Sequence, residues 1–187
     1  MFDELRISNI ATSDGALVID NLQFTPAVVN SWTNIHSARW DSVTNWSLGA
    51  LPASTQTVSI ANEGYKAVNV DGATFANFPT SMMVSNLFVG APTNALSTLL
   101  LNYAGLNAPL KVLNNCVIGI NGTIENSSSW FEVDGNAGGQ LLVDGTFTQN
   151  GGLTVVNAPV FVRSGALNAT NGNLTLGDVT LGSTNSS

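Results

Sequence analysis

The sequence predicts an all-β fold, a right-handed parallel β-solenoid (β-helix) with coils of about 21 residues, preceded by an N-terminal strand segment. Three observations lead to this prediction. Short apolar strands recur at nearly constant spacing, their apolar residues alternate with polar ones, and Gly or Asn follows most of them. No stretch shows the sustained period of 3.6 residues that marks an amphipathic helix.

Residues 1–30 precede the repeat and read as two strands, the second of them in "GALVIDNLQF". We expect this segment to be either a strand donated to a neighbouring chain or the remnant of a preceding jelly-roll domain. The apolar residues that would make such an inter-subunit contact are Leu17, Val18, Ile19, Leu22 and Phe24.

Residues 31–56 form a connection rich in Trp, with Trp32, Trp40 and Trp46 close together. A solenoid needs its terminal core covered, so we expect these side chains to cap the first coil. The alternative is a glycan-binding site in which exposed indole rings stack on sugar rings. The spacing of the three residues is compatible with either role.

The solenoid is expected over residues 57–187, most regularly near its end. The segments "LKVLN", "FEVDG", "LTVVN" and "LTLGD" begin 21, 22 and 21 residues apart, at Leu110, Phe131, Leu153 and Leu174. Their first and third residues are apolar, which predicts that both positions point inward. The third positions are Val112, Val133, Val155 and Leu176.

A second strand follows in each unit, and a third element in the first three begins with Gly122, Gly145 and Gly165. We expect these Gly residues at corners, where a positive φ is needed. The coils before residue 110 are less regular.

The stretch "ARWDSVTNWSLGALPASTQTVSI" resembles the opening of secreted bacterial repeat proteins with autotransporter-like β-helices, which begin W-x(n)-N-W-x-x-G-x-x-P. This resemblance covers residues 32–182 and implies a β-helix at the cell surface. Residues 2–13, "FDELRISNIATS", resemble the last strand of a concanavalin A-like, LamG-type jelly-roll. That second resemblance implies that the chain is a piece of a larger surface protein.

The composition excludes some classes of partner. Only 9% of residues are charged and the net charge is −7, while the five Lys and Arg are scattered singly, so nucleic-acid binding is not expected. Polarity supplied by Asn, Ser, Thr and Gly is typical of extracellular or cell-surface proteins. The start "MFDELRISN" lacks the pattern of a signal peptide, and no apolar run reaches the roughly 20 residues of a membrane-spanning helix.

The sequence predicts no catalytic residue, no metal site and no cofactor. Glycoside hydrolysis needs two facing carboxylates, but Glu132 is expected to point outward. The triplet "VDG" recurs at Asp71, Asp134 and Asp144, which indicates Asx turns at corners. The only histidine, His36, is expected at the surface or against Trp. The only cysteine, Cys116, is expected to be a small buried residue.

The predicted function is therefore a non-catalytic extracellular scaffold, as a filament subunit or as a stalk or adhesin module of a surface protein. The last coil would present an open edge to a second copy, giving a homo-oligomer or filament. The residues expected at that edge are Leu174, Leu176, Val179 and Leu181. The alternatives are a carbohydrate-binding module and a β-helix of the polysaccharide lyase or hydrolase type.

Overall fold

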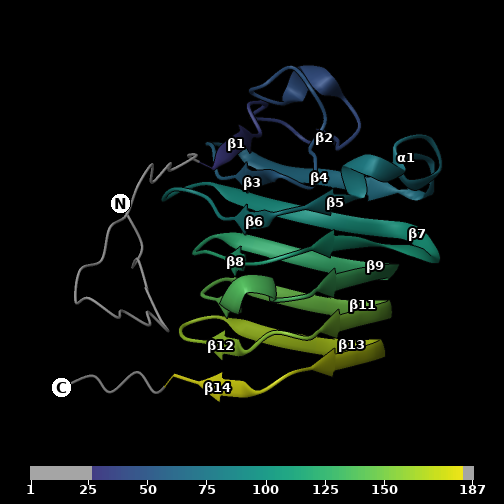
Figure 1. Cartoon of the computed structure of the whole chain (residues 1–187). Helices are drawn as coiled ribbons and strands as arrows, with labels where there is room; N and C mark the ends of the chain where they lie inside the picture. Colours follow the sequence, from purple (N-terminus) through teal and green to yellow (C-terminus); the bar gives the residue numbers. More distant parts are fainter. Residues whose placement is uncertain (1–26, 183–187) are drawn as a thin grey trace, which may run out of the picture.

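The computed structural model describes residues 27–182, which form mainly β-strands in two parallel sheets (Figure 1). The short-strand sheet contains, in spatial order, β1 (Val28–Ser31), β3 (Gln56–Ile60), β6 (Asn86–Val89), β8 (Cys116–Ile118), β10 (Leu141–Val143), β12 (Val160–Val162) and β14 (Val179–Leu181). The long-strand sheet contains, in the same direction, β2 (Ala38–Arg39), β4 (Tyr65–Asp71), β7 (Leu96–Val112), β9 (Gly122–Val133), β11 (Thr146–Val156) and β13 (Ala166–Leu176). The predominantly β class that the sequence predicts is confirmed.

The other elements are short. One α-helix, α1 (Gly72–Asn77), is followed by the 3-10 turn η2 (Pro79–Met82) and by β5 (Met83–Val84), which pairs with the end of β7. Two further 3-10 turns are η1 (Val43–Asn45) and η3 (Asn136–Gly138). The short helix and its turn were not predicted, because six residues are too few to show a helical period.

From β6 to β14 the chain alternates between the two sheets, and each strand pairs in parallel with the strand two places further along. The spacing between paired residues shortens along the chain. It is 29 residues between Val58 and Leu87 and 19 between Leu141 and Val160. A period of about 21 therefore describes only the later units, since the earlier ones carry insertions.

The predicted inward register is correct at first and then fails by one residue. Leu110 pairs with Phe131, as expected, but Phe131 pairs with Thr154 rather than Leu153. Val156 likewise replaces Val155 in the inward row, while Leu174 and Leu176 keep their places. Since side chains alternate with a period of two, this shift turns Leu153 and Val155 outward.

Hydrogen bonds inside the core explain how a Thr can take the place of a Leu. Asn126, Gln149 and Thr154 are fully buried on neighbouring strands. The amide nitrogen Nδ2 of Asn126 lies 3.2 Å from Gln149 Oε1 and 3.0 Å from Thr154 Oγ1. The Thr154 hydroxyl in turn donates to Gln149 Oε1. Burial of these polar groups is tolerated because they satisfy one another.

The Gly residues that begin the long strands are needed for close stacking rather than for positive φ. A Cβ on Gly145 would lie 2.2 Å from the carbonyl oxygen of Gly122, and one on Gly165 would lie 2.2 Å from that of Gly145. A Cβ on Gly122 would meet the carbonyl oxygen of Val89 at 2.1 Å. The prediction that these three residues need a positive φ is wrong, and Gly is needed there because a Cβ would collide with the backbone of a strand or turn packed against it.

The sheets begin earlier than residue 57, so the predicted boundary there is wrong. β1 pairs in parallel with β3, and β2 with β4, so the short-strand sheet begins at residue 28 and the long-strand sheet at residue 38. The Trp-rich segment is thus built onto the first strands rather than preceding them. Of the predicted segment 1–30, all but the last few residues lie outside the described part of the chain.

The Trp cluster covers one end of the core. Trp32, Trp40 and Trp46 are at most 3% exposed, and Trp46 packs edge-on against both others, with ring centroids 5.1 Å from Trp32 and 4.9 Å from Trp40. Trp46 Nε1 donates to the carbonyl oxygen of Trp40 at 2.8 Å. Because the rings are buried in the hydrophobic core, the capping interpretation fits the structure and the glycan platform at these three residues is wrong.

Candidate functional site

Two interruptions of the regular strand pattern face each other on the outer side of the long-strand sheet. The first is α1 with η2, inserted between β4 and β5. The second is a bulge in β7, where Gly105 pairs with Ser129 and Leu110 with Phe131, so that residues 106–109 have little on β9 to pair with. In repeat folds, insertions and bulges gather on functional faces. Their convergence makes the space between them the candidate site.

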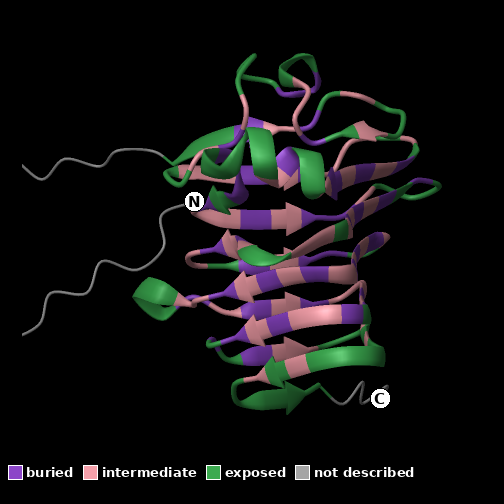
Figure 2. Ribbon diagram, turned by 90° about the vertical axis from the view of Figure 1, so that its right-hand side faces the viewer, coloured by how far each residue is buried: buried purple, intermediate pink, exposed green. Residues whose placement is uncertain are grey.

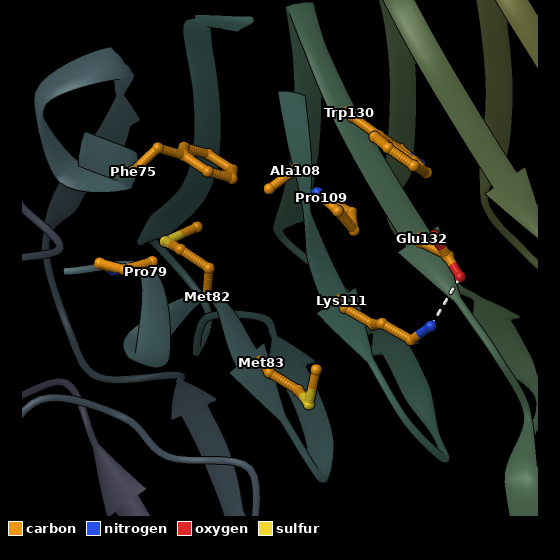
Figure 3. A pocket seen from close by; sticks show the side chains of 9 residues that line it. All are labelled: Phe75, Pro79, Met82, Met83, Ala108, Pro109, Lys111, Trp130 and Glu132. Carbon is orange, nitrogen blue, oxygen red and sulfur yellow. Dashed lines mark hydrogen bonds and ion pairs between the residues drawn. The ribbon is translucent and has the colours of Figure 1, made fainter. Parts of the chain in front are cut away.

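A groove of about 510 Å³ lies between these two features (Figure 3). Its lining is mainly apolar, and the residues that matter most are Phe75, Met82, Met83, Pro109, Trp130 and the Lys111–Glu132 pair. A smaller hollow of about 380 Å³, also lined by Ser54 and Thr80, shares Pro79 and Met83 with the groove. The volume and the mainly apolar lining of the groove are typical of sites that bind small molecules, which measure about 300–1,000 Å³.

Each wall follows from local sequence. Trp130 and Glu132 are two residues apart on β9 and therefore point to the same outer face. Lys111 on β7 lies between two strand partners, Glu132 on β9 and Met83 on β5. Met82, the last residue of η2, is buried, whereas Met83 is 40% exposed.

The polar part of the groove is a fixed ion pair. Lys111 Nζ lies 2.8 Å from Glu132 Oε1 and 3.0 Å from Asp134 Oδ2. The hydrogen bond to Glu132, followed by that to Asp134, raises the pKa of the Lys111 ammonium above its ordinary value. The ammonium of Lys111 therefore stays charged at neutral pH, and it lies beside the carboxylate groups of Glu132 and Asp134.

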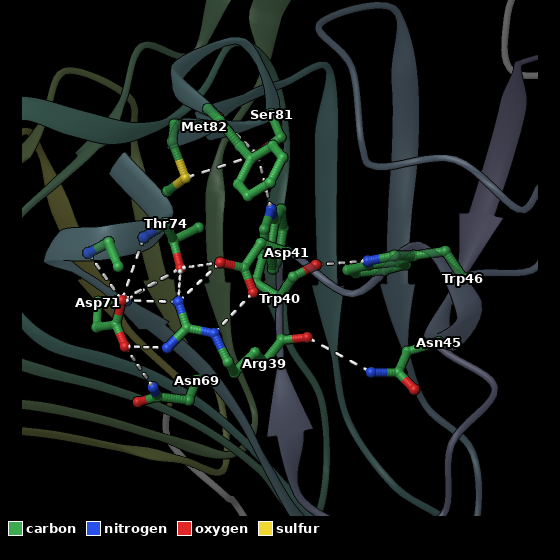
Figure 4. A network of polar contacts seen from close by, with 12 residues as sticks. Arg39, Trp40, Asp41, Asn45, Trp46, Asn69, Asp71, Thr74, Ser81 and Met82 are labelled. Atoms are coloured by element: carbon green, nitrogen blue, oxygen red, sulfur yellow. Dashed lines mark hydrogen bonds and ion pairs between the residues drawn. The ribbon is translucent and has the colours of Figure 1, made fainter. Parts of the chain in front are cut away.

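A second network anchors α1 to the sheet (Figure 4). Asp71 caps the helix, its Oδ1 accepting the N–H of Ala73 at 2.9 Å and of Thr74 at 3.1 Å. The guanidinium of Arg39 donates to Asp71 and, at 2.7 Å, to Asp41 Oδ2. These bonds tie β2 and the end of β4 to the helix that forms one wall of the groove.

The Asp71 carboxylate should make the free energy of unfolding fall as the pH becomes acidic. The hydrogen bond from Arg39 is the main cause that holds the pKa of Asp71 below its usual value. Its contribution is therefore complete above the unfolded pKa of about 3.9 and is lost as the pH falls through the lower folded pKa. We expect Asp71→Asn to reduce the free energy of unfolding by about 1 kcal/mol or less at pH 7, since the pair is partly exposed.

Urea denaturation from pH 7 to pH 2.5 checks this expectation. The difference between wild type and Asp71→Asn should shrink towards zero at the acid end, because Asn still accepts the capping bonds. A difference that stays constant over the whole range would show that the ion pair does not contribute.

The other acids considered as catalytic candidates are engaged in similar pairs. Glu132 and Asp134 share Lys111, so they lie on one side of the groove rather than facing each other. Asp144 is bound by Arg163, whose hydrogen bond lowers the pKa of that carboxyl. The Asx-turn prediction for the "VDG" triplets holds at Asp71, while Asp134 and Asp144 form ion pairs instead.

The remaining candidates lie away from the groove. His36 is exposed, and its backbone N–H donates to Asn34 Oδ1. Cys116 is completely buried, as expected, and burial raises the pKa of its thiol. Within residues 27–182, no three His, Cys, Asp or Glu side chains come together as a metal site. Over the same range, no helix has the length and apolar character needed to cross a bilayer.

The predicted inter-subunit residues fall into two groups. Leu17, Val18, Ile19, Leu22 and Phe24 lie outside the described residues. Leu174 and Leu176 on β13 are only partly buried, and Val179 and Leu181 on β14 are 45% and 73% exposed. Figure 2 shows the same loss of burial at this end of the sheets. Over the described range, β13 and β14 each pair on one side only.

The groove was not predicted from the sequence. One signal was present: Leu99 and Leu101 precede Leu110 too closely for a regular unit, which marks extra residues in this strand. The lining comes from three separate segments, residues 75–83, 108–111 and 130–132, and no linear motif predicts that they meet. The resemblances to autotransporter-like β-helices and to LamG domains stay predictions. No protein-family model, curated protein or solved structure matches this chain.

Proposed function

We propose that the two sheets are faces of one right-handed parallel β-solenoid, and that the chain is a non-catalytic extracellular structural module. The regular alternation of strands between the sheets supports a solenoid. Parallel strands joined by crossovers are right-handed in nearly all proteins, which supports the handedness. Low charge and a neutral polar surface support an extracellular location.

The observation that carries this proposal is the difference between the two ends. At the first end, the loop after β1 bonds to it: Ser47 N–H donates to the carbonyl oxygen of Ser31 at 2.8 Å, and Trp32 and Trp46 form an antiparallel bridge. At the other end, β13 and β14 have no further strand partner among residues 27–182, and the apolar side chains of Leu174, Leu176, Val179 and Leu181 lie along this edge. Such an edge accepts another strand readily.

This asymmetry favours a stalk or adhesin module over a filament subunit. A head-to-tail filament needs a complementary surface at both ends, and the Trp-containing loop occupies part of the first one. The filament would then require a donated strand, for which residues 15–24 are the candidate.

The lyase or hydrolase alternative is less well supported. Glu132 and Asp134 point to one side of the groove and share a single Lys, whereas glycoside hydrolysis needs carboxylates on opposite sides of the bond. Turnover of pectin, alginate or laminarin that disappears in Glu132→Gln would contradict a non-catalytic role.

Charges placed on the open edge test its role. We expect the wild-type chain to self-associate with rising concentration, and Val179→Lys with Leu181→Lys to shift it to monomers, because Lys blocks strand addition at an edge. Sedimentation velocity gives the species and negative-stain microscopy their shape. Val43→Lys, at a 45% exposed position near the other end, is the matched control.

The outcomes separate the two forms of the proposal. Fibres that vanish on deletion of residues 1–26, which leaves β1 intact, would support a filament built by strand donation. Association that persists in the Lys variants would exclude this edge as the contact. A wild-type chain that stays monomeric at every concentration would exclude the filament and leave the stalk.

A further inference from the structure

We propose that the groove between the α1–η2 insertion and the 106–109 bulge binds a neutral glycan chain. This inference does not depend on the open edge at β13 and β14. It rests on the shape of the groove, on an aromatic ring with a fixed ion pair beside it, and on the backbone pairing of the strands that form its floor.

Trp130 is the aromatic surface of the groove (Figure 3). Its Nε1 is buried without a hydrogen-bond partner among the described residues, so the part of the indole that reaches the groove is ring carbon rather than N–H. Pro109 and Phe75 add further apolar surface to the lining. The C–H faces of a pyranose ring pack on such a surface, since it is flat and apolar.

The apolar surface continues beyond the groove. Leu153, which the one-residue register shift turns outward, pairs with Trp130 across β9 and β11. Val155 pairs with Glu132 in the same way, and both side chains are half-buried. A chain of several sugar rings lying across the sheet would therefore find apolar contacts on successive strands.

The ion pair supplies what sugar hydroxyls require. Glu132 Oε1 and Asp134 Oδ2 hold Lys111 Nζ at 2.8 and 3.0 Å. An ammonium has three protons and a carboxylate has two acceptor oxygens, so a donor and the second oxygen of Glu132 stay available. Two neighbouring sugar hydroxyls can therefore bind at once, one accepting a hydrogen bond from the Lys111 ammonium and the other donating one to the free oxygen of Glu132.

The pairing of the strands argues against an extended peptide as the occupant. Peptides bound to sheets gain affinity from main-chain hydrogen bonds at an edge. β7 and β9, which form the floor, are interior strands with neighbours on both sides. A peptide lying on this floor would have only side-chain contacts there, whereas a glycan needs no backbone partner.

The charge balance selects a neutral glycan over an acidic one. Among residues 27–182, Lys111 is the one cation that lines the groove, and the carboxylates of Glu132 and Asp134 flank it. The whole chain carries a net charge of −7. Uronate polymers would therefore be repelled, and no clamp of Arg or Lys is offered to their carboxylates.

Affinity electrophoresis of the full chain in gels containing laminarin, xyloglucan, galactomannan or dextran tests the proposal. We expect at least one of these neutral glycans to retard the protein, and alginate and polygalacturonate to leave it unretarded. Isothermal titration should then show binding weakened about tenfold or more by Trp130→Ala, the effect of losing an aromatic anchor.

Two further variants keep the test independent of folding. Glu132→Gln keeps the shape and an acceptor oxygen and should weaken binding a fewfold, by about the effect of one charge-assisted hydrogen bond. Tyr103→Ala removes an aromatic side chain that is 74% exposed on the same strand as Lys111 but does not line the groove, and should leave binding unchanged.

Several results would overturn the proposal. One is that none of the four neutral glycans retards the protein. A second is that neither Trp130→Ala nor Glu132→Gln weakens binding, and a third is that alginate retards the protein as much as a neutral glycan does. A peptide selected by display that binds through Trp130, with no glycan bound, would make the groove a peptide site instead.

Discussion

Replacing Leu110 by Ala is expected to lower the free energy of unfolding by about 2–5 kcal/mol, and the same change at Leu153 by about 1 kcal/mol or less. The sequence pattern predicts both residues in one inward row. In the structure Leu110 is fully buried opposite Phe131, whereas Leu153 is half-buried on the outer face opposite Trp130. Only the first substitution leaves a cavity in the core.

Urea denaturation of the two variants measures the difference directly. Because the substitution is the same, helix or strand preferences and the unfolded state contribute almost equally and cancel in the comparison. Equal losses at the two positions would mean that Leu153 points inward after all. The free energy of unfolding of Thr154→Ala tests the register a second time, since Thr154 is the residue that points into the core.

Replacing Gly145 by Ala should cost about 3 kcal/mol, because the new Cβ has no room. It would lie 2.2 Å from the carbonyl oxygen of Gly122 and 2.4 Å from that of Gly119. Both are backbone atoms of the neighbouring strand and its approach, so relief requires the strands to move apart. The parallel pairing of Thr146 with Thr123, the next residues along, would be disturbed first.

Gly72→Ala is the matched control. Gly72 begins α1, and the nearest atom to its Cβ would be the carbonyl oxygen of Tyr103 at 3.8 Å, an ordinary contact. We expect this variant to be as stable as wild type or up to about 1 kcal/mol more stable, because Ala restricts the unfolded chain. Thermal unfolding followed by circular dichroism distinguishes the two. A Gly145→Ala protein as stable as wild type would show that these strands are not stacked so closely.

Part of the site was accessible from the sequence and part was not. The outward direction of Glu132 and the buried state of Cys116 follow from alternation and residue type alone. The partners of Glu132, Asp134 and Asp144 do not, because an ion pair depends on which residues lie opposite on the neighbouring strand. Lys111 stands 21 residues before Glu132, and Arg163 stands 19 residues after Asp144.

The sequence by itself determined the strand-rich class, the approximate length of the later units and the Gly at or just before the start of β9, β11 and β13, since alternation and close stacking leave a mark on each of these units. It did not determine the register beyond Phe131. The apolar pattern predicts Leu153 inward and Thr154 outward, because it considers only the hydrophobicity of each residue. In the folded chain Thr154 is the buried one, since Asn126 and Gln149 give its hydroxyl hydrogen-bond partners. Tertiary structure also decided the fate of the Trp cluster and created the groove, because a ring is buried, and a cavity is formed, by segments that meet only when the chain has folded.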